Sequence, residues 1–305
     1  MTSPSKGKAT EPGETISSDV LTTLKYVRQF RDSTVVVKLG GSILQDDELL
    51  GQICADISSA RSVGVRVVLV HGGGPAINQE LESKGIKWSF VDGLRVTSPE
   101  MMNVIEMVLC GQVNRRIVKA LAEHGLKPVG LSGHDAGTLV CRQADPRLGL
   151  VGEIERVNTQ LIEMVLGMVD DLGARSVPVV APVGWTRQPI AGQSSLNVNA
   201  DWAASRIASA LGVTKMLFLT DQDGILNRDG KLIPELDAGG VEALIEEGVV
   251  QGGMLAKART VLYAIQNKVT DVHILNARRP HALLEELFTD HGIGTVCRLR
   301  SVSVN

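Results

Sequence analysis

Two units of strand, glycine turn and helix follow one another near the start of the chain, and this repetition limits the possible folds more than any other feature. A β-branched run over residues 34–38 ends at Gly40-Gly41, and residues 46–63 then have the pattern of a helix. A second apolar strand over residues 65–70 ends at His71-Gly72-Gly73-Gly74-Pro75, where the fixed φ of proline suits a first helical turn. This alternation is typical of a parallel sheet covered by its crossover helices.

The same alternation returns in the C-terminal half of the chain. We expect strands at residues 177–180, 215–220 and 272–275, and helices at residues 158–172, 201–211, 254–266 and 281–288. The middle is less regular. Residues 90–96 are expected to form a strand or ribbon, and short apolar pieces to form hairpin ribbons near Val129, Leu139 and Val151. We therefore predict an α/β fold with one continuous sheet shared by two lobes, which meet near residues 185–195.

The N-terminal segment divides into a tail and a helix. Residues 1–18 are rich in Ser, Thr, Gly, Pro and Glu, and are expected to stay flexible. Val20, Leu24 and Val27 fall on one helical face, which predicts an amphipathic helix within residues 19–32. The rest of the chain shows neither an internal repeat nor a Pro/Ser-rich linker, and we divide it into lobes at residues 33–190 and 191–305.

Composition argues against several classes of function. The 305 residues are 44 % hydrophobic and 21 % charged, as in ordinary globular proteins, and a net charge of −3 with 3 % aromatics argues against nucleic-acid binding. No apolar run is long enough to span a bilayer, and the first 18 residues lack the apolar core of a secretory signal. The four cysteines form no CxxC pair and the six histidines no HxxxH pair. We expect free thiols, no protein-ligated metal, no membrane partner and a cytoplasmic location.

Glycines at the predicted strand ends indicate where a ligand binds. Ligands of open α/β sheets lie outside the carboxyl ends of the strands, and this chain has Gly40-Gly41, Gly72-Gly73-Gly74 and Asp223-Gly224 there. Backbone N–H groups exposed by glycine, together with a helix N-terminus, favour a phosphate or a carboxylate. A simple turn explains a single glycine pair equally well, but the triple glycine favours an anion site. The P-loop motif and the Rossmann glycine motif do not occur.

Two lysines and a polar run complete the candidate chemistry. Lys38 lies at the carboxyl end of the first strand. Lys257 follows Gly252-Gly253-Met254 at a helix start, where a cation opposes the helix dipole, so an anionic ligand explains it better than helix stability does. The run from Asn197 to Asp201 opens another helix, which N-capping alone could explain. Taken singly, Arg95 is explained as a surface arginine.

Together these segments resemble the amino acid kinase family, and within it the members that phosphorylate N-acetyl-L-glutamate. Each segment is short, but six in family order, spread over residues 20–300, are specific. The resemblance implies a three-layer αβα sandwich with a mainly parallel central sheet, the amino acid kinase or carbamate kinase-like fold. The matching segments are Val37-Lys38-Leu39-Gly40-Gly41, Val70-His71-Gly72-Gly73-Gly74-Pro75, Gly93-Leu94-Arg95-Val96-Thr97, Asn197-Val198-Asn199-Ala200-Asp201, Leu219-Thr220-Asp221 and Gly252-Gly253-Met254 through Lys257.

The resemblance also implies an activity and a set of roles. The activity is phosphoryl transfer from ATP, accompanied by Mg²⁺, to the side-chain carboxylate of N-acetyl-L-glutamate in arginine biosynthesis. Lys38 and Lys257 would neutralise the transferring phosphoryl group, and Asp201 would hold both lysines. The first lobe would bind the acyl amino acid and the second lobe ATP. The remaining implied contacts are Gly73, Gly74, Arg95 and Asn197 with the acyl amino acid, and Gly40, Gly41, Thr220, Asp221, Gln222, Asp223, Gly224, Ile225, Leu226, Val249, Val250 and Gln251 with ATP.

Regulation by arginine is a further implication of the resemblance. Family members inhibited by arginine carry an N-terminal helix that links dimers into a ring-shaped hexamer, and residues 19–30 supply a similar helix. We therefore expect a homo-oligomer, either a dimer or a hexamer, with L-arginine as its effector. The alternative is a plain flanking helix beside a core histidine. The implied arginine contacts are Tyr26, Lys215, His273, Glu286 and Gly292.

Three positions depart from the family pattern and leave other functions open. His134 stands where the family has lysine, Asn276 begins Asn-Ala-Arg in place of Asp-Gly-Arg, and Ala256 replaces a proline. One alternative is a sister kinase that acts on an aminoadipate derivative or on carrier-protein-linked glutamate. Another is a non-catalytic arginine sensor, which the intact lysines argue against. A carbamate kinase, an aspartokinase and a nucleotide-binding dehydrogenase are more distant.

Overall fold

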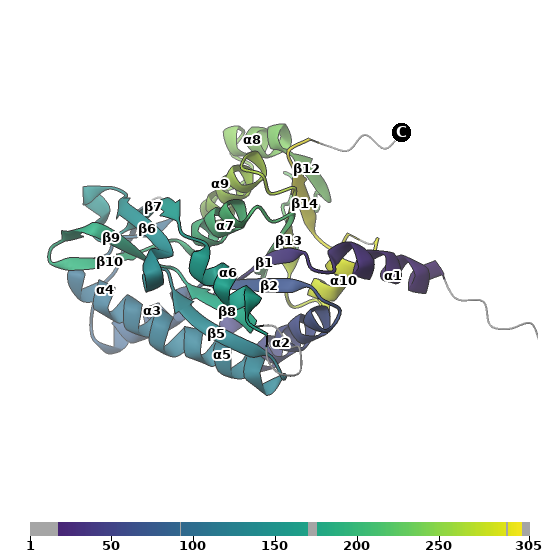
Figure 1. Ribbon diagram of the computed structural model, residues 1–305. Helices are drawn as coiled ribbons and strands as arrows, with labels where there is room; N and C mark the ends of the chain where they lie inside the picture. The colour runs from purple at the N-terminus through teal and green to yellow at the C-terminus, as the bar shows by residue number, and fades with distance from the viewer. Residues whose placement is uncertain (1–17, 92, 170–175, 291, 301–305) are drawn as a thin grey trace, which may run out of the picture.

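β1 lies in the middle of the main sheet and carries Lys38 near its carboxyl end. The computed structural model describes residues 18–300 except 92, 170–175 and 291, so the tail predicted over residues 1–18 lies, apart from Ser18, outside the described residues. Eight strands of the described chain form one sheet in the order β12-β14-β13-β11-β1-β2-β8-β5 (Figure 1). Their bounds are β1 Thr34–Leu39, β2 Arg66–His71, β5 Lys127–Ser132, β8 Ser176–Ala181, β11 Lys215–Thr220, β12 Glu235–Asp237, β13 Asp271–Asn276 and β14 Thr295–Arg298.

Helices cover both faces of this sheet, which confirms the predicted three-layer αβα sandwich (Figure 1). α2 packs between α5 and α10 on one face, and α6, α7 and α9 pack on the other. The α-helices are α1 Ser18–Phe30, α2 Asp47–Ser62, α3 Gly74–Ser83, α4 Pro99–Glu106, α5 Asn114–Glu123, α6 Gln160–Gly167, α7 Ala200–Leu211, α8 Ala238–Glu246, α9 Gly252–Gln266 and α10 Ala282–Phe288. Shorter helical turns are η1 Ile43–Gln45, η3 Asp135–Gly137 and η4 Pro146–Leu148, and η2 Met107–Val113 is a π-helix.

In the main sheet, β2, β5 and β8 lie on one side of β1, and β11 to β14 lie on the other side. β11, β13, β1, β2, β8 and β5 run parallel, and β14 is antiparallel to β13. Lys38 pairs with Val70 on one side and with Phe218 on the other. α2, which follows β1, covers one face, whereas α9, which lies between β11 and β13, covers the other. A parallel sheet leaves a crevice at the carboxyl ends of its strands where the crossovers change face, and Lys38 lies beside this crevice.

A second sheet, with the order β10-β9-β6-β7, stands beside the first. Its strands are β6 Leu139–Gln143, β7 Gly152–Val157, β9 Val183–Ile190 and β10 Gln193–Asn197. The antiparallel β6–β7 pair confirms the ribbons predicted near Leu139 and Val151. The same prediction near Val129 is wrong, because β5 is a parallel edge strand of the main sheet. Edge strands tolerate proline and glycine, and Pro128 and Gly130 interrupt the apolar pattern of β5.

Several elements are not apparent in the sequence pattern. β9, β10, α8, β12 and β14 fall outside the expected elements, and α6 ends at Gly167, before the expected residue 172. Residues 185–195, near which the lobes are expected to meet, lie within the antiparallel β9–β10 pair. β9 ends in the exposed stretch Arg187-Gln188-Pro189, so it carries no continuous apolar signal. The expected ribbon at residues 90–96 is a short hairpin of β3 Phe90–Val91 and β4 Leu94–Arg95.

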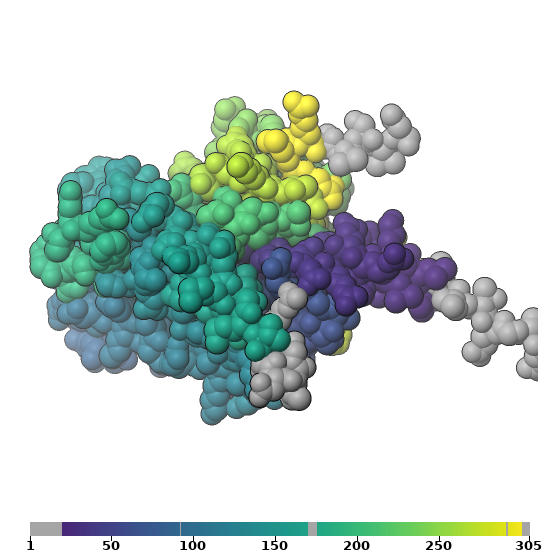
Figure 2. All heavy atoms as spheres, in the orientation of Figure 1, coloured from purple at the N-terminus to yellow at the C-terminus, as the bar shows by residue number. Residues whose placement is uncertain are grey.

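The N-terminal helix α1 projects from the body of the molecule and packs on α10 (Figure 2). Its bounds agree with the helix predicted over residues 19–30. Val20, Leu21 and Leu24 are about half exposed, whereas Phe30 is buried with its ring 5.1 Å from the Lys215 ammonium group. α1 therefore presents apolar side chains to the surroundings while its last turn anchors it to the domain.

Two further features of the fold concern its cysteines and its helix lengths. Cys54, Cys110, Cys141 and Cys297 are free, and burial raises the pKa of each thiol to about 12. Across the described part of the chain, every helix is too short or too polar to cross a bilayer.

Candidate active site

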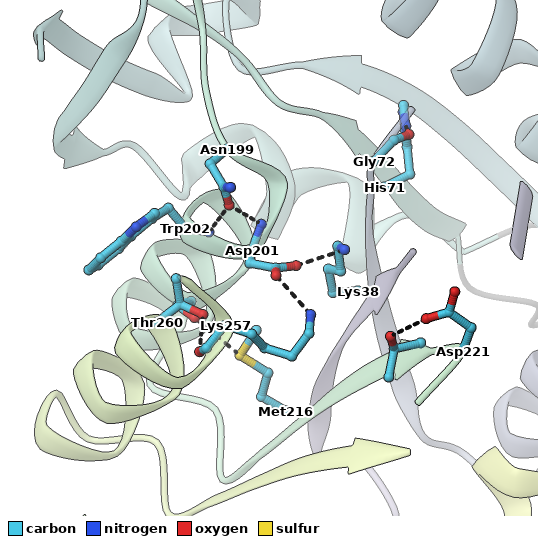
Figure 3. A network of polar contacts seen from close by, with 12 residues as sticks. Lys38, His71, Gly72, Asn199, Asp201, Trp202, Met216, Asp221, Lys257 and Thr260 are labelled. Carbon is cyan, nitrogen blue, oxygen red and sulfur yellow. Dashed lines mark hydrogen bonds and ion pairs between the residues drawn. The ribbon is translucent and has the colours of Figure 1, made fainter. Parts of the chain in front are cut away.

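Three charged side chains from separate segments meet at the carboxyl end of β1 (Figure 3). Lys38 comes from β1, Asp201 from the first turn of α7 and Lys257 from the second turn of α9. The Lys38 Nζ lies 2.7 Å from Asp201 Oδ1, and the Lys257 Nζ donates a 2.8 Å hydrogen bond to Asp201 Oδ2. Lys38 and Lys257 are only 8 % and 7 % exposed. One carboxylate thus holds two buried ammonium groups, and the trio carries a net positive charge.

The start of α7 explains how Asp201 is aimed. Asn199 is the N-cap, and its Oδ1 accepts hydrogen bonds from the backbone nitrogens of Asp201 at 2.8 Å and Trp202 at 3.2 Å (Figure 3). A carboxylate in the first turn is also favoured by the helix dipole. The polar run therefore both caps the helix and fixes the carboxylate between the lysines.

The charge states of this trio follow from its burial. Burial by itself raises the pKa of Asp201, but the charges of Lys38 and Lys257 outweigh burial and hold that pKa well below its usual range. Burial lowers the pKa of Lys257, and the attraction of Asp201 acts against this effect. Asp201 is therefore ionised near neutral pH and serves to position the lysines rather than to accept a proton.

Two glycine turns lie side by side next to Lys38. A Cβ on Gly41 would lie 3.2 Å and 3.3 Å from the backbone nitrogens of Gly74 and Gly73, so a larger residue would push the turns apart. The Gly72 nitrogen donates to the Leu39 carbonyl at 3.0 Å, which continues the β1–β2 ladder into the turn. Gly41 and Gly72 to Gly74 line one cavity with Lys38. The predicted anion-binding turns therefore face the same space.

The π-helix η2 packs against the triple-glycine turn. A Cβ on Gly73 would lie 2.6 Å from the Leu109 Cδ2 and 3.5 Å from the Val113 Cγ2. The φ of Gly73 is 178°, an extended value that any residue adopts, so a larger residue here would meet no backbone strain but would displace the Leu109 side chain. π-helical turns are frequent at functional sites, and here such a turn carries Leu109 to the wall of the cavity.

His71 and Asn114 hold the start of the same turn. The His71 Nδ1 lies 2.9 Å from the Gly72 carbonyl, and its Nε2 lies 3.2 Å from the Asn114 Nδ2. Because the amide nitrogen is a donor, Nε2 accepts and Nδ1 carries the hydrogen. Burial lowers the pKa of His71 to about 4, so the ring is neutral. The Asn114 Nδ2 also donates to the Val179 carbonyl at 2.9 Å, which ties the turn to β8.

The substrate-binding candidates line a cavity of about 280 Å³ beside Lys38, hereafter the main cavity. Gly73, Gly74, Arg95 and Asn197 all contribute to it. The Asn197 Nδ2 donates to the Thr97 Oγ1 at 3.1 Å, and the Thr97 hydroxyl donates to the Arg95 carbonyl at 2.8 Å. Asn197 and Arg95 are thereby fixed relative to one another, and the Asn197 Oδ1 is left as an acceptor.

Arg95 brings a buried hydrogen-bond donor to this cavity. Its Nη2 donates to the Asn78 Oδ1 at 2.5 Å, and its guanidinium lies 4.7 Å from the centre of the Phe90 ring. Its Nη1 is buried and has no hydrogen-bond partner within the described residues. Burial lowers the pKa of Arg95, yet a guanidinium stays charged in proteins. A ligand carboxylate is the group that satisfies such a donor.

Asp221 connects the predicted nucleotide segment to the lysines. The Ser42 hydroxyl hydrogen-bonds to Asp221, and the charge of Asp221 acts on Lys257. The Thr220 hydroxyl also donates to the Asp221 Oδ1, at 3.3 Å (Figure 3). Gly40 lies beside this segment, with its nitrogen donating to the Leu219 carbonyl at 3.0 Å.

The other predicted nucleotide residues divide between the surface and the core. Ile225 and Val250 are buried, so only their backbones could meet a ligand. Gly224 is needed because its φ is +148° and a Cβ there would lie 2.5 Å from the Thr295 Oγ1. Val249 is partly buried. The exposed members are Gln222, Asp223, Leu226 and Gln251, the last of which is the N-cap of α9.

Three of the predicted arginine contacts meet in a second charged cluster between β11, β13 and α10. The His273 Nδ1 donates to the Glu286 Oε1 at 2.8 Å, and the Lys215 Nζ donates to the Glu286 carbonyl at 3.2 Å and lies 3.5 Å from Oε1. Burial raises the pKa of Glu286, but the bond from His273 and the charge of Lys215 outweigh it and lower that pKa. Burial also lowers the pKa of His273 and of Lys215.

Tyr26 lies next to this cluster and Gly292 is exposed. The Tyr26 hydroxyl donates to the Asp290 Oδ1 at 2.5 Å, and the pKa of Tyr26 is raised, first by this hydrogen bond and by burial. The neighbouring charge of Glu286 acts in the same direction. Gly292 stands two residues after Asp290 at the surface. α1 is thus linked to the segment just after α10, the helix that carries Glu286.

Sequence reasoning misses Asn78 and Asn114, which position Arg95 and His71. Asn78 lies four residues after Gly74, one helical turn into α3, and this spacing was the available signal. Two departures from the family pattern also have clear positions. His134 lies against the β9–β10 hairpin, with its Nε2 3.4 Å from the Ser194 Oγ, and the Asn276 Nδ2 donates to the Asp223 Oδ1 at 2.7 Å. Asn276 therefore supports the nucleotide segment.

Comparison with known proteins identifies the family of the chain. A family model described as "Amino acid kinase family" matches residues 33–276. An "Acetylglutamate kinase" from Campylobacter curvus (strain 525.92) is 44 % identical over 284 residues, covering 93 % of this chain and 98 % of that protein.

Solved structures show the same fold. N-acetylglutamate synthase from Neisseria gonorrhoeae, complexed with coenzyme A and N-acetyl-glutamate, aligns with a TM-score of 0.79 and 26 % identity. This alignment covers 95 % of this chain and 65 % of that one. Carbamate kinase from Giardia lamblia bound to AMP-PNP aligns with a TM-score of 0.65 and 17 % identity over 88 % of this chain and 99 % of that one, which shows a common fold.

The chain belongs to the amino acid kinase family and is an ATP-using kinase. Within that family it is similar to acetylglutamate kinases over nearly its whole length.

Proposed function

We propose that this kinase transfers the γ-phosphoryl group of ATP to the side-chain carboxylate of N-acetyl-L-glutamate, giving an acyl phosphate and ADP in arginine biosynthesis. The observation that carries the proposal is the contact of Lys38 and Lys257 with Asp201 at 2.7 and 2.8 Å, beside the main cavity. The same cavity is lined by Arg95, whose buried Nη1 has no hydrogen-bond partner among the described residues. The named relative at 44 % identity supports the same substrate. This cavity therefore recognises a ligand with two carboxylates, one that reacts and one that is anchored.

The two ends of the substrate match the two ends of the cavity. The α-carboxylate binds Arg95, whose buried Nη1 needs an acceptor. The N-acetyl amide binds at Asn197, whose Oδ1 accepts the amide N–H. The reacting carboxylate then lies near Lys38 and the backbone N–H groups of Gly73 and Gly74, which line the same cavity.

The protein contributes positioning and charge to the transfer. The substrate carboxylate attacks the γ-phosphorus, the bond to the β–γ bridging oxygen breaks, and ADP leaves with that oxygen. A carboxylate nucleophile needs no general base, so the lysines and glycine amides stabilise charge on the phosphoryl oxygens. Lys38 approaches from the acyl-substrate side and Lys257 from the nucleotide side, each held by Asp201.

Mg²⁺ fits this site as an ion that arrives with the nucleotide. Among the described residues, no three His, Cys, Asp or Glu side chains gather into a metal cage, and Asp221 is the exposed carboxylate near Lys257. Mg²⁺ commonly keeps phosphate and water ligands with one or two carboxylates. We propose that it supplies additional neutralisation of the phosphates, with Asp221 as its protein neighbour.

Feedback by L-arginine is part of the proposal. The His273 Nε2 is buried without a hydrogen-bond partner in the described structure, and as the unprotonated nitrogen it is an acceptor for a guanidinium N–H. Glu286 supplies a carboxylate beside it, and Tyr26 couples α1 to the same place.

The exposed apolar face of α1 supports its role in a homo-oligomer, a dimer or a hexamer. The free cysteines support a cytoplasmic location.

The activity is tested with purified protein and Mg-ATP, by trapping the acyl phosphate with hydroxylamine. We expect hydroxamate and ADP with N-acetyl-L-glutamate, and neither with free glutamate or N-acetyl-aminoadipate. Lys257→Gln should lower kcat by at least about a hundredfold, while Lys119→Gln, an exposed lysine on α5, should not change it. Turnover only with N-acetyl-aminoadipate would indicate a sister kinase that acts on an aminoadipate derivative. Folded, ATP-binding protein that is silent with all three would favour a carrier-linked substrate or a sensor.

The regulatory proposal is tested by arginine titration of two truncated forms. Removal of residues 1–30 deletes α1 and should abolish inhibition, whereas removal of residues 1–17 leaves α1 and should preserve it. Inhibition that survives the longer truncation would contradict the role given to α1.

A further inference from the structure

A second cavity of about 260 Å³ adjoins the main cavity. Leu94, Val198 and Asn199 line both of them. These three residues therefore form the partition between the two spaces. Val198 is buried, and Asn199 is fixed because it caps α7. Leu94 lies on the short strand β4 and is only partly buried, so its side chain is the least constrained of the three.

The lining of the second cavity is mainly apolar, with Glu153 and Arg206 as its charged members. Ile154 and Ala144 contribute aliphatic surface, and Trp202 contributes an aromatic wall. The Trp202 ring meets the Tyr263 ring edge-on, at 5.5 Å between centroids. Arg206, also in the lining, donates to the Ile154 carbonyl at 2.6 Å, so a polar group of this wall is engaged. The space suits a hydrocarbon chain.

The partition lies where the acyl group of the proposed substrate must sit. Arg95 and Asn197, which bind the α-carboxylate and the amide N–H, are the sequence neighbours of Leu94 and Val198. The acyl carbon is bonded to that amide nitrogen. An amide held at Asn197 therefore directs its acyl chain toward the partition, and away from the reacting end at Lys38.

We propose that Leu94 sets the acyl-chain length that this kinase accepts, and that the second cavity is an acyl subsite which Leu94 closes. This inference rests on the proposed function. With Leu94 in place the main cavity ends after an acetyl group. Shortening Leu94 joins the two cavities, and a chain two methylenes longer passes the partition to contact Ile154 and Trp202.

The experiment compares N-acetyl- with N-butyryl-L-glutamate in the hydroxylamine assay with Mg-ATP. The Leu94→Ala variant should raise the butyryl-to-acetyl ratio of kcat/KM by about tenfold over the unmodified protein, the value for two newly buried methylenes. Leu94→Val, which disturbs the hairpin less, should give a smaller rise in the same direction. Adding Ala144→Leu to Leu94→Ala refills the second cavity and should return the ratio toward its original value.

Ile154→Val is the matched control, because it enlarges the second cavity without opening the partition and should leave the ratio unchanged. An unchanged ratio in both Leu94 variants, with normal turnover of the acetyl substrate, would overturn the inference and leave the proposed function standing. Absence of turnover with N-acetyl-L-glutamate in the unmodified protein would instead overturn the proposed function.

Discussion

Replacement of Asp201 by asparagine is the sharpest test of how the site is held together. Asp201→Asn keeps the shape of the side chain and removes the one carboxylate that contacts both Lys38 and Lys257. Both lysines are less than a tenth exposed, so water cannot replace the lost charge. The variant should fold less stably as well as lose activity.

The size of the effect follows from the two distances. At 2.7 and 2.8 Å, each ammonium–carboxylate attraction is about 6 kcal/mol for an effective dielectric constant of about 20. Desolvation of the buried ions offsets much of this attraction, and removing one partner of a buried pair typically leaves a loss of about 3–5 kcal/mol. We expect Asp201→Asn to lower the free energy of unfolding by this amount at pH 7.

The pH dependence gives a second check with a definite sign. Without Asp201 the attraction that raises the pKa of Lys257 is gone, so its pKa falls further below the ordinary value of 10.5. Between the folded and unfolded pKa values the unfolded chain binds more protons, and stability then rises with pH. The deficit of Asp201→Asn relative to the unmodified protein should therefore shrink from pH 7 toward pH 10.

Guanidinium chloride unfolding, followed by tryptophan fluorescence, measures both effects. Asp271→Asn is the matched control, because Asp271 pairs with Arg298 at 2.8 Å but both side chains are about a quarter exposed. It should cost about 1 kcal/mol or less. A stability loss for Asp201→Asn no larger than that of the control, or a deficit that grows with pH, would refute the reasoning.

Four further outcomes follow from the contacts described. Arg95→Lys keeps the charge but loses the planar guanidinium, so the KM for N-acetyl-L-glutamate should rise at least tenfold with little change in kcat. An unchanged KM in steady-state assays would count against the anchoring role of Arg95. Glu286→Gln should raise the arginine concentration for half-inhibition at least tenfold while kcat stays constant; undiminished inhibition would place the effector elsewhere. Asn114→Ala removes the donor to His71 and Val179 and should cost about 1–3 kcal/mol in urea unfolding, whereas full stability would show that water replaces it. The pKa of His71 is lowered from 6.5 to about 4, so the free energy of unfolding should fall by up to roughly 3 kcal/mol as pH drops through this window. His71→Phe should remove this contribution to the pH dependence of stability. An identical slope in the variant would assign acid sensitivity to other groups.

The parts of the fold that sequence predicts are those with an uninterrupted local signal. β1, β2, β8, β11 and β13 are mainly apolar and almost wholly buried, so most of their core positions are visible in the chain itself. β5 and β9 are interrupted by Pro, Gly or charged residues, and only their partners in the sheets make them strands. β12 has three residues and carries too little pattern to be recognised.

The candidate site shows the same division. Lys38 and the glycine turns stand next to strong strand signals, so their shared position at the sheet edge can be predicted. The meeting of Lys38 with Lys257 comes from family resemblance, because more than two hundred residues separate them. Asn114 acts through long-range hydrogen bonds that no local pattern marks, and the position of Asn78 one turn into α3 does not by itself reveal its bond to Arg95. Ile225 and Val250 lie in predicted nucleotide segments, yet packing turns their side chains into the core.

The β1–β11 ladder has a mechanical consequence for the reaction. Five residue pairs join β1 and β11. Lys38 lies on β1, and Lys257 lies on α9, which packs on β13 and β14 beyond β11. A hinge that swings apart two bodies on a linker would have to break this ladder. Parallel strands instead tolerate a range of mutual twist of some tens of degrees without losing their hydrogen bonds. Any change in the gap between the two ammonium groups must therefore come from torsion of one sheet, and we expect nucleotide binding to change the strand twist at β1 while the hydrogen-bond register is preserved.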